Sequence, residues 1–502
     1  MSNTNAAVTN IQDPYSGATI AGLMPSFNTP TLLGVDARDG TKTSRPLSEL
    51  GNAARLTDKY SGDIYYVHQA NAWLIWRNGA WSWNVGGAEV RRLATLLPDQ
   101  IYSEGRLYLN DAFLFAKWAR LSQKETTIKA TVLLLKDVDI VRLSLSSVDA
   151  DLFKAGINNS KHVLDLKEGI VKPSKQSDLI TKSLGVNSIG EASKAVRWLE
   201  FLNQVFENDV ELIDWIKRFC GYMLTGSTEE HILIFCFGLG ANGKSVFGEI
   251  LRFILGDYAR AIAPESLTES KRVAGGASPD LADLIGARLA ISAETEDGTA
   301  LAESLVKSLV SGDAMTVRQL YCPLVEFIPQ FKLIILGNHK PIVKGNDHGI
   351  WRRVCLIPFN RIFRPEERDP KLITKLKDEA PNILAWMVEG CLDWQSRGLK
   401  DLPAVIVNAT ESYQEEQDLI GIWISECCDK SPSKETTAAD IYTNYTEWCT
   451  ANGLRSSSNI TLGRRLGERG FKAIKTKGKR GWSGLSIIDP DYAEKYRAAS
   501  GR

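Results

Sequence analysis

The stretch from Gly238 to Ser245, GLGANGKS, combines glycines, an asparagine, a lysine and a serine in eight positions. It follows the apolar run ILIFCF, precedes a second apolar stretch, and fits the pattern G-x-x-x-x-G-K-[ST]. Glycines are costly in backbone entropy, so a glycine-rich turn indicates that something approaches the backbone closely. Backbone N–H groups of such a loop and the N-terminus of the next helix form a cradle for phosphates. We therefore expect a nucleotide here, with Lys244 beside its β- and γ-phosphates.

The same loop supplies one ligand for a metal ion. The Ser245 hydroxyl is predicted to bind Mg²⁺. The alternative is a chance match to the pattern. Nucleotide contacts are predicted for Gly238, Gly240, Ala241, Asn242, Gly243, Lys244, Ser245 and Val246.

Two acids in RLAISAETEDG are candidates for holding magnesium and orienting water. Glu294 and Glu296 follow a predicted strand, and acids at the carboxyl end of a parallel strand lie where ligands bind. Glu294 is predicted on the metal side, and Glu296 beside the attacking water. Alternate strand positions point to opposite faces, so which glutamate does which job stays open. The alternative is a pair of solvated strand-end acids.

Two later motifs add polar residues beside predicted strands. FKLIILGNHKP places Asn338 after a strand, either near the γ-phosphate and the water or in a plain turn. GIWRRVCLIPF places Arg352 and Arg353 directly before a strand. These arginines either pair with acids at the core edge or enter a neighbouring subunit's nucleotide site as a finger. Catalytic roles are predicted for Lys244, Glu294, Glu296, Asn338, Arg353 and Arg352.

These motifs need a frame that brings strand ends together. Between 231 and 360, the runs ILIFCF, RLAISA, FKLIIL and VCLIPF alternate with helical patterns, which is typical of a mainly parallel α/β sheet flanked by helices. Upstream, Asn78-Gly79 predicts a tight hairpin, KHVLDLKEGIVKP a second one, and 193–224 two helices. Residues 370–425 are predicted to be helical, followed by a linker, DKSPSKETT. The hairpin tryptophans favour core or subunit packing over base stacking: Trp73, Trp76, Trp81 and Trp83.

Composition bounds the class of protein. The 502 residues exceed one ordinary core and predict two to four domains, with 44% hydrophobic and 24% charged residues. No apolar run reaches the roughly 18 residues of a membrane span, and the polar start predicts a flexible tail and no secretory signal. Eight cysteines without a CxxC pair predict reduced thiols, no structural metal and a cytoplasmic location. The net charge of zero says nothing about nucleic acid.

Taken in order, the motifs resemble those of the superfamily III helicases, a branch of the AAA+ ATPases, and especially the poxvirus- and phage-type primase-helicase family. FGLGANGKSVF is similar to Walker A, RLAISAETEDG to Walker B, and LGNHKP to motif C with Asn338 as sensor 1. GIWRRVCLIPF resembles the finger segment, with Arg353 the better candidate because it abuts the strand. The segments around LGNAARLTDKY and WLEFLNQVF resemble the domain before the helicase core and the helical collar. The resemblance covers roughly residues 46 to 490.

The resemblance implies an ATP hydrolase and ring-forming DNA helicase that moves 3′ to 5′ on single-stranded DNA, in replication of a phage or mobile element. It implies ATP and Mg²⁺, single-stranded and forked DNA, a homo-hexamer, and a separate primase or polymerase. The expected fold is an AAA+ core with an α+β N-terminal domain, a helical collar and a C-terminal winged helix. The predicted domains are a tail (1–45), a pre-helicase domain (46–188), the collar (189–228), the core (229–370), a helical lid or linker (371–430) and the winged helix (431–502).

DNA contacts are expected in two places. The segment Gly312–Phe327 resembles the hairpin that lines the ring's channel, where Arg318 offers a cation, Tyr321 a flat ring, and Gln319 lies between them. Lys307 is a further channel candidate, and the alternative is an ordinary surface hairpin. In the tail, nine basic residues between 455 and 482 are opposed only by one glutamate. A helix followed by strand, basic turn and strand indicates a winged helix there, or else a solvated charged face. The predicted contacts are Arg464, Arg465, Lys475, Lys477, Lys479 and Arg480.

Two other functions stay open. The first is a replication initiator that binds and melts one origin through its tail. The second is a primase-helicase in one chain, because Asp137, Asp139, Ser160, His162 and Asp165 imitate the order of an archaeo-eukaryotic-type primase site. No nucleotide-binding fold of adequate size is expected around them, so His162 and Asp165 are predicted to be structural.

Overall fold

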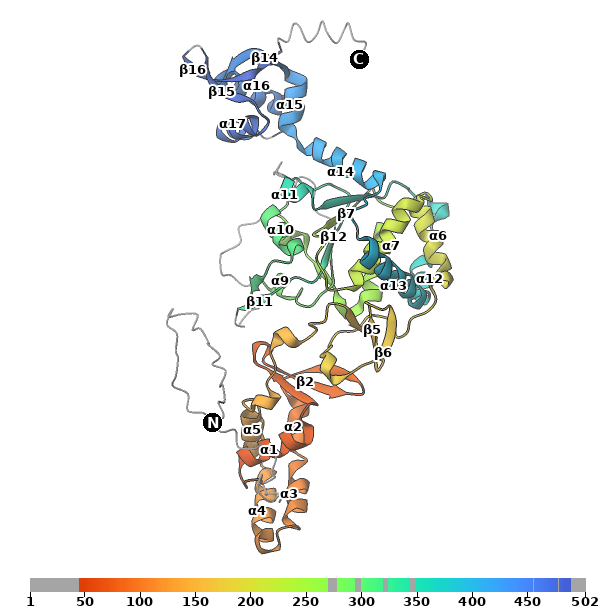
Figure 1. Ribbon diagram of the computed structural model, residues 1–502, viewed down its shortest axis with the longest axis vertical. Coiled ribbons are helices and arrows are strands. Elements are labelled where there is room, and N and C mark those ends of the chain that lie inside the picture. Colours follow the sequence, from red (N-terminus) through yellow and green to blue (C-terminus); the bar gives the residue numbers. More distant parts are fainter. Residues whose placement is uncertain are drawn as a thin grey trace, which may run out of the picture. The chain divides into compact units, whose positions relative to one another are not determined.

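The computed structural model describes residues 45–269, 278–293, 299–318, 324–343, 348–454, 456–476 and 478–488. The chain divides into two compact units, Met1–Val148 and Asp149–Arg502 (Figure 1). In the described ranges, no helix combines the length and apolar character that a bilayer crossing requires.

The first unit packs helices against a small antiparallel sheet. Asn78 and Gly79 have φ values of 53° and 82°, as the tight turn requires, so the predicted hairpin is confirmed. Trp73 and Trp81 are buried in this unit, as a packing role predicts, while Trp76 and Trp83 are half-buried. The elements are α1 (Glu49–Tyr60), β1 (Ile64–Val67), β2 (Ala72–Arg77), β3 (Ala80–Val85), α2 (Ala88–Ala94), α3 (Leu97–Gly105), α4 (Ala112–Ser122) and α5 (Glu125–Leu135).

The second unit is built on a parallel sheet of five strands in the order β13-β7-β12-β9-β8. Every neighbouring pair in this sheet is parallel, so the predicted α/β frame is confirmed. All four predicted strands form, and a fifth, β8, was not predicted because its sequence ARAI has only four residues and one of them is an arginine. The strands are β7 (Leu233–Phe237), β8 (Ala259–Ile262), β9 (Leu289–Ser292), β12 (Lys332–Gly337) and β13 (Val354–Pro358).

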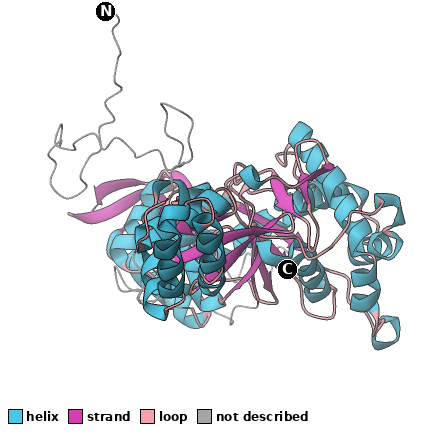
Figure 2. Ribbon diagram, turned by 90° about the horizontal axis from the view of Figure 1, so that it is seen from below, coloured by secondary structure: helices cyan, strands magenta, loops and turns pink. Residues whose placement is uncertain are grey.

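Alternate residues of these strands enter two separate cores, one on each face of the sheet. Ile234 and Cys236 of β7 belong to one cluster, whereas Leu233 and Phe235 belong to the other. Strands buried on both faces read as continuous apolar runs, as ILIFCF does. Helices cover the sheet (Figure 2), among them α8 (Lys244–Leu255), which contacts β9 and β12.

Other elements of this unit surround the sheet. The predicted hairpin from KHVLDLKEGIVKP is confirmed as β5 and β6. The elements are β4 (Lys154–Gly156), β5 (His162–Asp165), β6 (Ile170–Pro173), α6 (Val196–Val205), α7 (Val210–Leu224), α9 (Pro279–Ala282), α10 (Glu303–Ser311), β10 (Met315–Val317), β11 (Val325–Phe327), α11 (His348–Trp351), α12 (Leu372–Asp378), α13 (Ala380–Arg397) and α14 (Ala404–Gln417).

The last part of the chain forms a three-stranded sheet with three helices. The predicted linker DKSPSKETT is wrong, because these residues lie in β14 (Cys428–Thr437), which pairs with β16 (Lys479–Ile487). Most side chains of β14 face solvent, so its sequence lacks the apolar alternation that marks a half-buried strand. The remaining elements are α15 (Leu419–Cys427), α16 (Ala438–Ala451), α17 (Asn459–Glu468) and β15 (Lys472–Thr476).

Helices α7 and α13 meet backbone to backbone, through a glycine on each. A Cβ added to Gly221 would lie 2.0 Å from the backbone nitrogen of Cys391. One added to Gly390 would lie 2.1 Å from the backbone oxygen of Lys217. No side chain fits at either position, so these glycines set the distance between the two helices.

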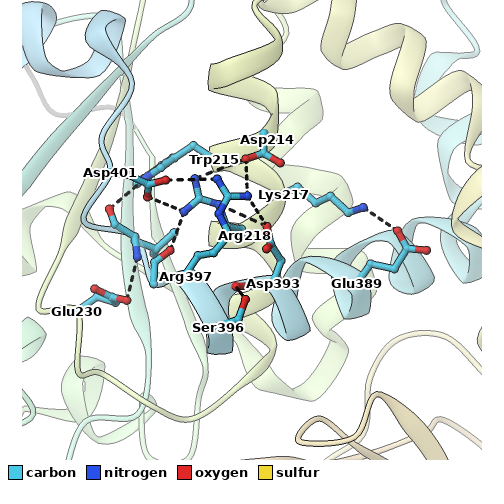
Figure 3. A network of polar contacts seen from close by, with 12 residues as sticks. Asp214, Trp215, Lys217, Arg218, Glu230, Glu389, Asp393, Ser396, Arg397 and Asp401 are labelled. Atoms are coloured by element: carbon cyan, nitrogen blue, oxygen red, sulfur yellow. Dashed lines mark hydrogen bonds and ion pairs between the residues drawn. The ribbon is translucent and has the colours of Figure 1, made fainter.

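Arg218 of α7 lies at the centre of an ion-pair network that continues this contact (Figure 3). Its side chain is 2% exposed, and Nη1 donates to Asp401 Oδ1 at 2.6 Å and to the Gly398 carbonyl at 2.7 Å. Arg397 of α13 approaches the same Asp401 at 3.4 Å and reaches Asp393 at 3.0 Å. The network therefore fixes α7, α13 and the turn after α13 as one rigid support.

We predict that Gly390→Ala lowers the thermal midpoint strongly, because the new methyl group collides with backbone that cannot move alone. The matched control is Gly467→Ala in α17, where nothing lies within 4 Å of an added Cβ. The free energy of unfolding of the control should rise by about 0.5–1 kcal/mol, because alanine lowers the backbone entropy of the unfolded chain. Equal midpoints for the two variants, measured by calorimetry, would contradict the proposed close contact.

The second prediction concerns pH. The hydrogen bond and charge of Arg218 lower the pKa of Asp401. A carboxyl group whose pKa is lower in the folded protein stabilises the fold at pH values above its unfolded-state pKa of about 3.9. This contribution to stability is lost as the pH falls through the folded-state pKa. Asp401→Asn should therefore cost about 1 kcal/mol at pH 7, a value reduced for solvent exposure, and nothing near pH 2.

The control for this prediction is Asp378→Asn, since Asp378 is exposed and has no ion pair with the described residues. Urea unfolding at both pH values measures the effect. A penalty for Asp401→Asn that is the same at pH 7 and pH 2 would rule out the ion pair as its cause.

Candidate functional site: the phosphate loop and two basic surfaces

The glycine-rich loop lies at the carboxyl edge of the parallel sheet. β7 ends at Phe237, whose register partners are Gly337 of β12 and Pro358 of β13. The loop runs from Gly238 to Gly243, and α8 begins at Lys244. The predicted strand–loop–helix context is therefore present, at the edge where open α/β sheets bind ligands.

The loop backbone has the conformation that its glycines predict. Gly240, Ala241 and Gly243 have φ values of 93°, 48° and 90°. A Cβ on Gly243 would lie 2.8 Å from Val205, and one on Gly238 would lie 2.4 Å from the Phe359 carbonyl. By contrast, nothing lies within 4 Å of the Cβ position of Gly240. The loop is thus packed closely at its two ends and open at its middle, as a phosphate site requires.

Asn242 and Lys244 are buried together beneath the loop, with exposures of 2% and 5%. Asn242 Nδ2 donates to the Phe359 carbonyl at 3.0 Å, and its Oδ1 accepts from Lys244 Nζ at 3.0 Å. Lys244 Nζ also donates to the Gly238 carbonyl at 2.5 Å. Both of these acceptors are neutral oxygens, and a phosphate oxygen is a stronger, anionic acceptor for an ammonium.

The remaining loop residues lie at the start of α8. Ser245 is exposed in the first turn, and Val246 is half-buried behind it. An exposed hydroxyl at this position fits the predicted contribution to a magnesium ion. Cys236 lies in β7, two residues before the loop, and burial raises the pKa of its thiol to about 12. That thiol stays protonated at neutral pH and is not a nucleophile.

The other predicted catalytic residues are described only in part. β9 ends at Ser292, in register with Ile335 of β12, so the chain leaves β9 at the same edge as the loop. Glu294 and Glu296 themselves lie outside the described residues. Asn338 directly follows β12 and is half-buried. The Gly337 carbonyl accepts from the Gly238 N–H at 3.4 Å, which places Asn338 next to the first loop residue.

The two arginines before β13 differ in their surroundings. Arg353 turns back and donates from Nη1 to the Gly349 carbonyl of α11, while its own carbonyl accepts from Leu233 N. Arg352 is exposed. The sequence favoured Arg353 as the finger, but Arg352 has the guanidinium that faces solvent.

Sequence reasoning missed Lys340 and its partners on α14. Lys340 Nζ lies 2.7 Å from Glu416 and 5.0 Å from the ring centre of Phe237, the last residue of β7. Tyr413 Oη donates to the Pro341 carbonyl. α14 is thereby tied to the segment that follows Asn338. The only sequence signal was the lysine two residues after that asparagine.

The described contacts do not support a primase site at the residues whose order resembles one. Ser160 Oγ lies 2.8 Å from His162 Nδ1, and Asp165 binds Lys172 at 2.8 Å within its own hairpin. Asp137 and Asp139 belong to the other compact unit.

The predicted channel hairpin is present as β10 and β11, which pair antiparallel from Met315–Phe327 to Val317–Val325. Arg318 is exposed at the end of β10. Gln319 and Tyr321 lie outside the described residues, and Lys307 is half-buried on α10.

The basic tail has the predicted helix, strand, turn and strand, as α17, β15 and β16. Lys475 and Arg480 are direct register partners, and Lys479 follows the turn, all three exposed. None of them forms an ion pair with a described residue. Arg464 and Arg465 lie 3.7 and 3.8 Å from Glu468, and Lys477 lies outside the description. Like charges placed opposite each other destabilise a hairpin, which points to an anionic partner.

Comparisons with known proteins find similarity to helicases and primases of large DNA viruses. Residues 53–207 match the family described as D5 N terminal like, and residues 236–353 match a family of unknown function (DUF5906). This finding and the relatives below confirm the resemblance to the superfamily III-type primase-helicases.

The curated relatives are proteins of large DNA viruses with provisional names. A helicase of Acanthamoeba polyphaga mimivirus is 26% identical over 68% of this chain and 38% of its own length. A helicase of Frog virus 3 is 30% identical over 52% of this chain and 29% of its own. A primase of African swine fever virus is 25% identical over 51% and 29%. The chain thus matches only about a third of the length of these relatives.

Among solved structures, the apo C-terminal region of NrS-1 aligns with 88% of this chain and 99% of its own, at 12% identity and a TM-score of 0.48. That score is too low to carry an argument.

We predict that Lys475→Thr stabilises the β15–β16 hairpin by about 0.2–1 kcal/mol while weakening duplex DNA binding, because it removes one of two facing cations. The control is Lys472→Thr, whose register partner is Ser483. Hydrogen exchange of the hairpin amides and DNA titration measure the two effects. If this surface is only solvated and has no role in DNA binding, Lys475→Thr should stabilise the hairpin and leave DNA binding unchanged. Destabilisation of the hairpin by Lys475→Thr would contradict the facing of Lys475 and Arg480.

Proposed function

We propose that this protein is an ATP-dependent DNA helicase that assembles as a ring and acts in the replication of a phage or other mobile element. The phosphate loop carries the proposal. Its open middle, its buried lysine and its place beside Asn338 are what nucleoside triphosphate hydrolysis needs. The viral relatives named as helicases support the DNA substrate.

In this proposal the loop amides and Lys244 bind the β- and γ-phosphates of ATP. Lys244 exchanges its loop acceptors, the Gly238 carbonyl and Asn242 Oδ1, for phosphate oxygens. Mg²⁺, when bound, neutralises phosphate charge, with Ser245 and Glu294 as its proposed ligands. Asn338 positions the attacking water, and Glu296 or Glu294 accepts its proton.

An exposed arginine at the sheet edge supports action between subunits. Arg352 has a solvent-facing guanidinium, which is what a finger entering a neighbour's site requires, whereas Arg353 is bound to its own helix. We therefore propose that Arg352 completes the neighbouring site and that Arg353 positions it. A homo-hexamer with 3′-to-5′ movement follows from the family resemblance.

Two alternatives have specific support. The facing cations of β15 and β16 fit an initiator that binds one duplex sequence. The relative named as a primase supports a primase-helicase, whereas a helicase without primase activity would act with a separate primase or polymerase.

The test is ATP turnover with and without single-stranded DNA, together with displacement of a labelled strand from a fork. The helicase proposal expects stimulated turnover and displacement, with both lost in Lys244→Ala. Tight binding of one duplex without displacement favours the initiator, and primer synthesis favours the primase-helicase.

We predict that Arg352→Ala retains ATP binding but loses at least tenfold in turnover, because the transition-state charge loses its partner. Mixing Arg352→Ala with Glu296→Gln subunits should restore part of the turnover, since some interfaces then combine two intact halves. Arg353→Ala is the control for local packing. No recovery on mixing, at protein concentrations where subunits exchange, would contradict action across an interface.

A further inference from the structure

A cavity of about 440 Å³ opens on the first unit, far in sequence from the phosphate loop. Its walls come from the sheet, from the Gly86–Gly87 turn, and from α2 and α5, which contact each other (Figure 1). The volume lies in the range of small-ligand sites, which runs from about 300 to 1,000 Å³.

Three cations line this cavity. Arg91 lies on α2, Lys129 lies on α5, and Lys136 directly follows α5. Lys129 pairs with Glu125 at 2.7 Å, and both side chains are exposed. Within the described ranges, Arg91 and Lys136 have no carboxylate partner. Lys136 Nζ instead lies 4.6 Å from the ring centre of Tyr66. Two of the three cations that line the cavity therefore have no carboxylate partner among the described residues, and an anion bound there could pair with them.

The cavity lining adds a hydrogen-bond donor, the indole N–H of Trp73. Trp73 is 1% exposed and lines the cavity, and its indole N–H makes no hydrogen bond to any described residue. A Cβ on Gly87 would lie 3.2 Å from Trp73 Nε1, so glycine at this position keeps the indole edge uncovered. An N–H that lines a cavity without a described protein partner is available to donate to water or to a ligand there.

The cavity rim is apolar. Val85 and Leu133 line the opening and are 80% and 62% exposed. Donors and cations on the inside with apolar side chains at the mouth suit a ligand that has an anionic, acceptor-rich end and a flat apolar end.

We propose that this cavity binds a nucleotide, with its phosphate on Arg91, Lys129 and Lys136 and its base or sugar against Val85 and Leu133. The nucleotide is either a residue of single-stranded DNA or a free nucleoside triphosphate. All the residues involved lie in the first unit, so the proposal stands independently of the ATP site and of the proposed function.

The test uses the full chain with Lys244→Ala, which removes the phosphate-loop lysine. Two probes are cross-linked by light and mapped by mass spectrometry: a single-stranded oligonucleotide with 5-iododeoxyuridine, and 8-azido-ATP. The variant Arg91→Glu/Lys136→Glu is compared with Arg92→Glu/Lys124→Glu. The control changes the same net charge on the same helices or beside them, at exposed residues that do not line the cavity.

For a DNA strand, we expect oligonucleotide cross-links within residues 64–91 or 129–136. The cavity variant should bind the oligonucleotide about tenfold more weakly, and its log–log salt slope should fall by about 0.7 for each lost phosphate contact. If the ligand is a free nucleotide, the cavity variant should bind the oligonucleotide as tightly as its parent does. The azido-ATP label on these peptides should disappear in the cavity variant. Trp73→Phe should weaken the same probe without changing charge.

The proposal is overturned if neither probe labels these peptides, or if the cavity variant and the control behave alike. Circular dichroism and thermal midpoints show that the compared variants are folded.

Discussion

The phosphate loop depends on one side chain, Asn242, which joins the loop to the sheet on one side and to Lys244 on the other. Its Nδ2 donates to the Phe359 carbonyl just after β13, and its Oδ1 accepts from the lysine ammonium. A buried ammonium needs acceptors, and a loop rich in positive φ values needs an anchor. Asn242 supplies both, so the protein itself anchors the loop conformation that we propose for phosphate binding.

The sheet and helices around the loop turn this local arrangement into a rigid site. Both faces of β7 are buried in separate cores, so the strand that leads into the loop has little freedom. Behind one face, the glycine contact and the Arg218 network join α7 to α13. On the other side, α14 contacts the segment after Asn338 and continues toward the last part of the chain, which gives the two regions a direct covalent and polar connection.

Much of this arrangement is predictable from the sequence, because several signals are local. The loop pattern, the apolar runs and Asn78-Gly79 each depend on a few neighbouring residues. The errors arise where long-range packing decides. β14 is polar because its side chains face water, so nothing local distinguishes it from a linker. Lys332 begins β12 yet is 2% exposed, since its ammonium donates to the Thr225 and Ser227 carbonyls, and burial lowers its pKa. The difference between Arg352 and Arg353 is instead local, since Arg353 donates to the Gly349 carbonyl four residues earlier, a contact that the sequence alone does not show.

The most direct test of the central claim is calorimetric binding of Mg·ATP, Mg·ADP and adenosine to the wild-type chain and to Lys244→Ala. We expect the wild type to bind ATP and ADP but adenosine only weakly, because the proposed contacts of the loop are to the phosphates. Lys244→Ala should weaken ATP binding at least tenfold while the chain stays folded. Equal affinity of both proteins for ATP, or equal affinity of the wild type for adenosine and ATP, would contradict the phosphate site.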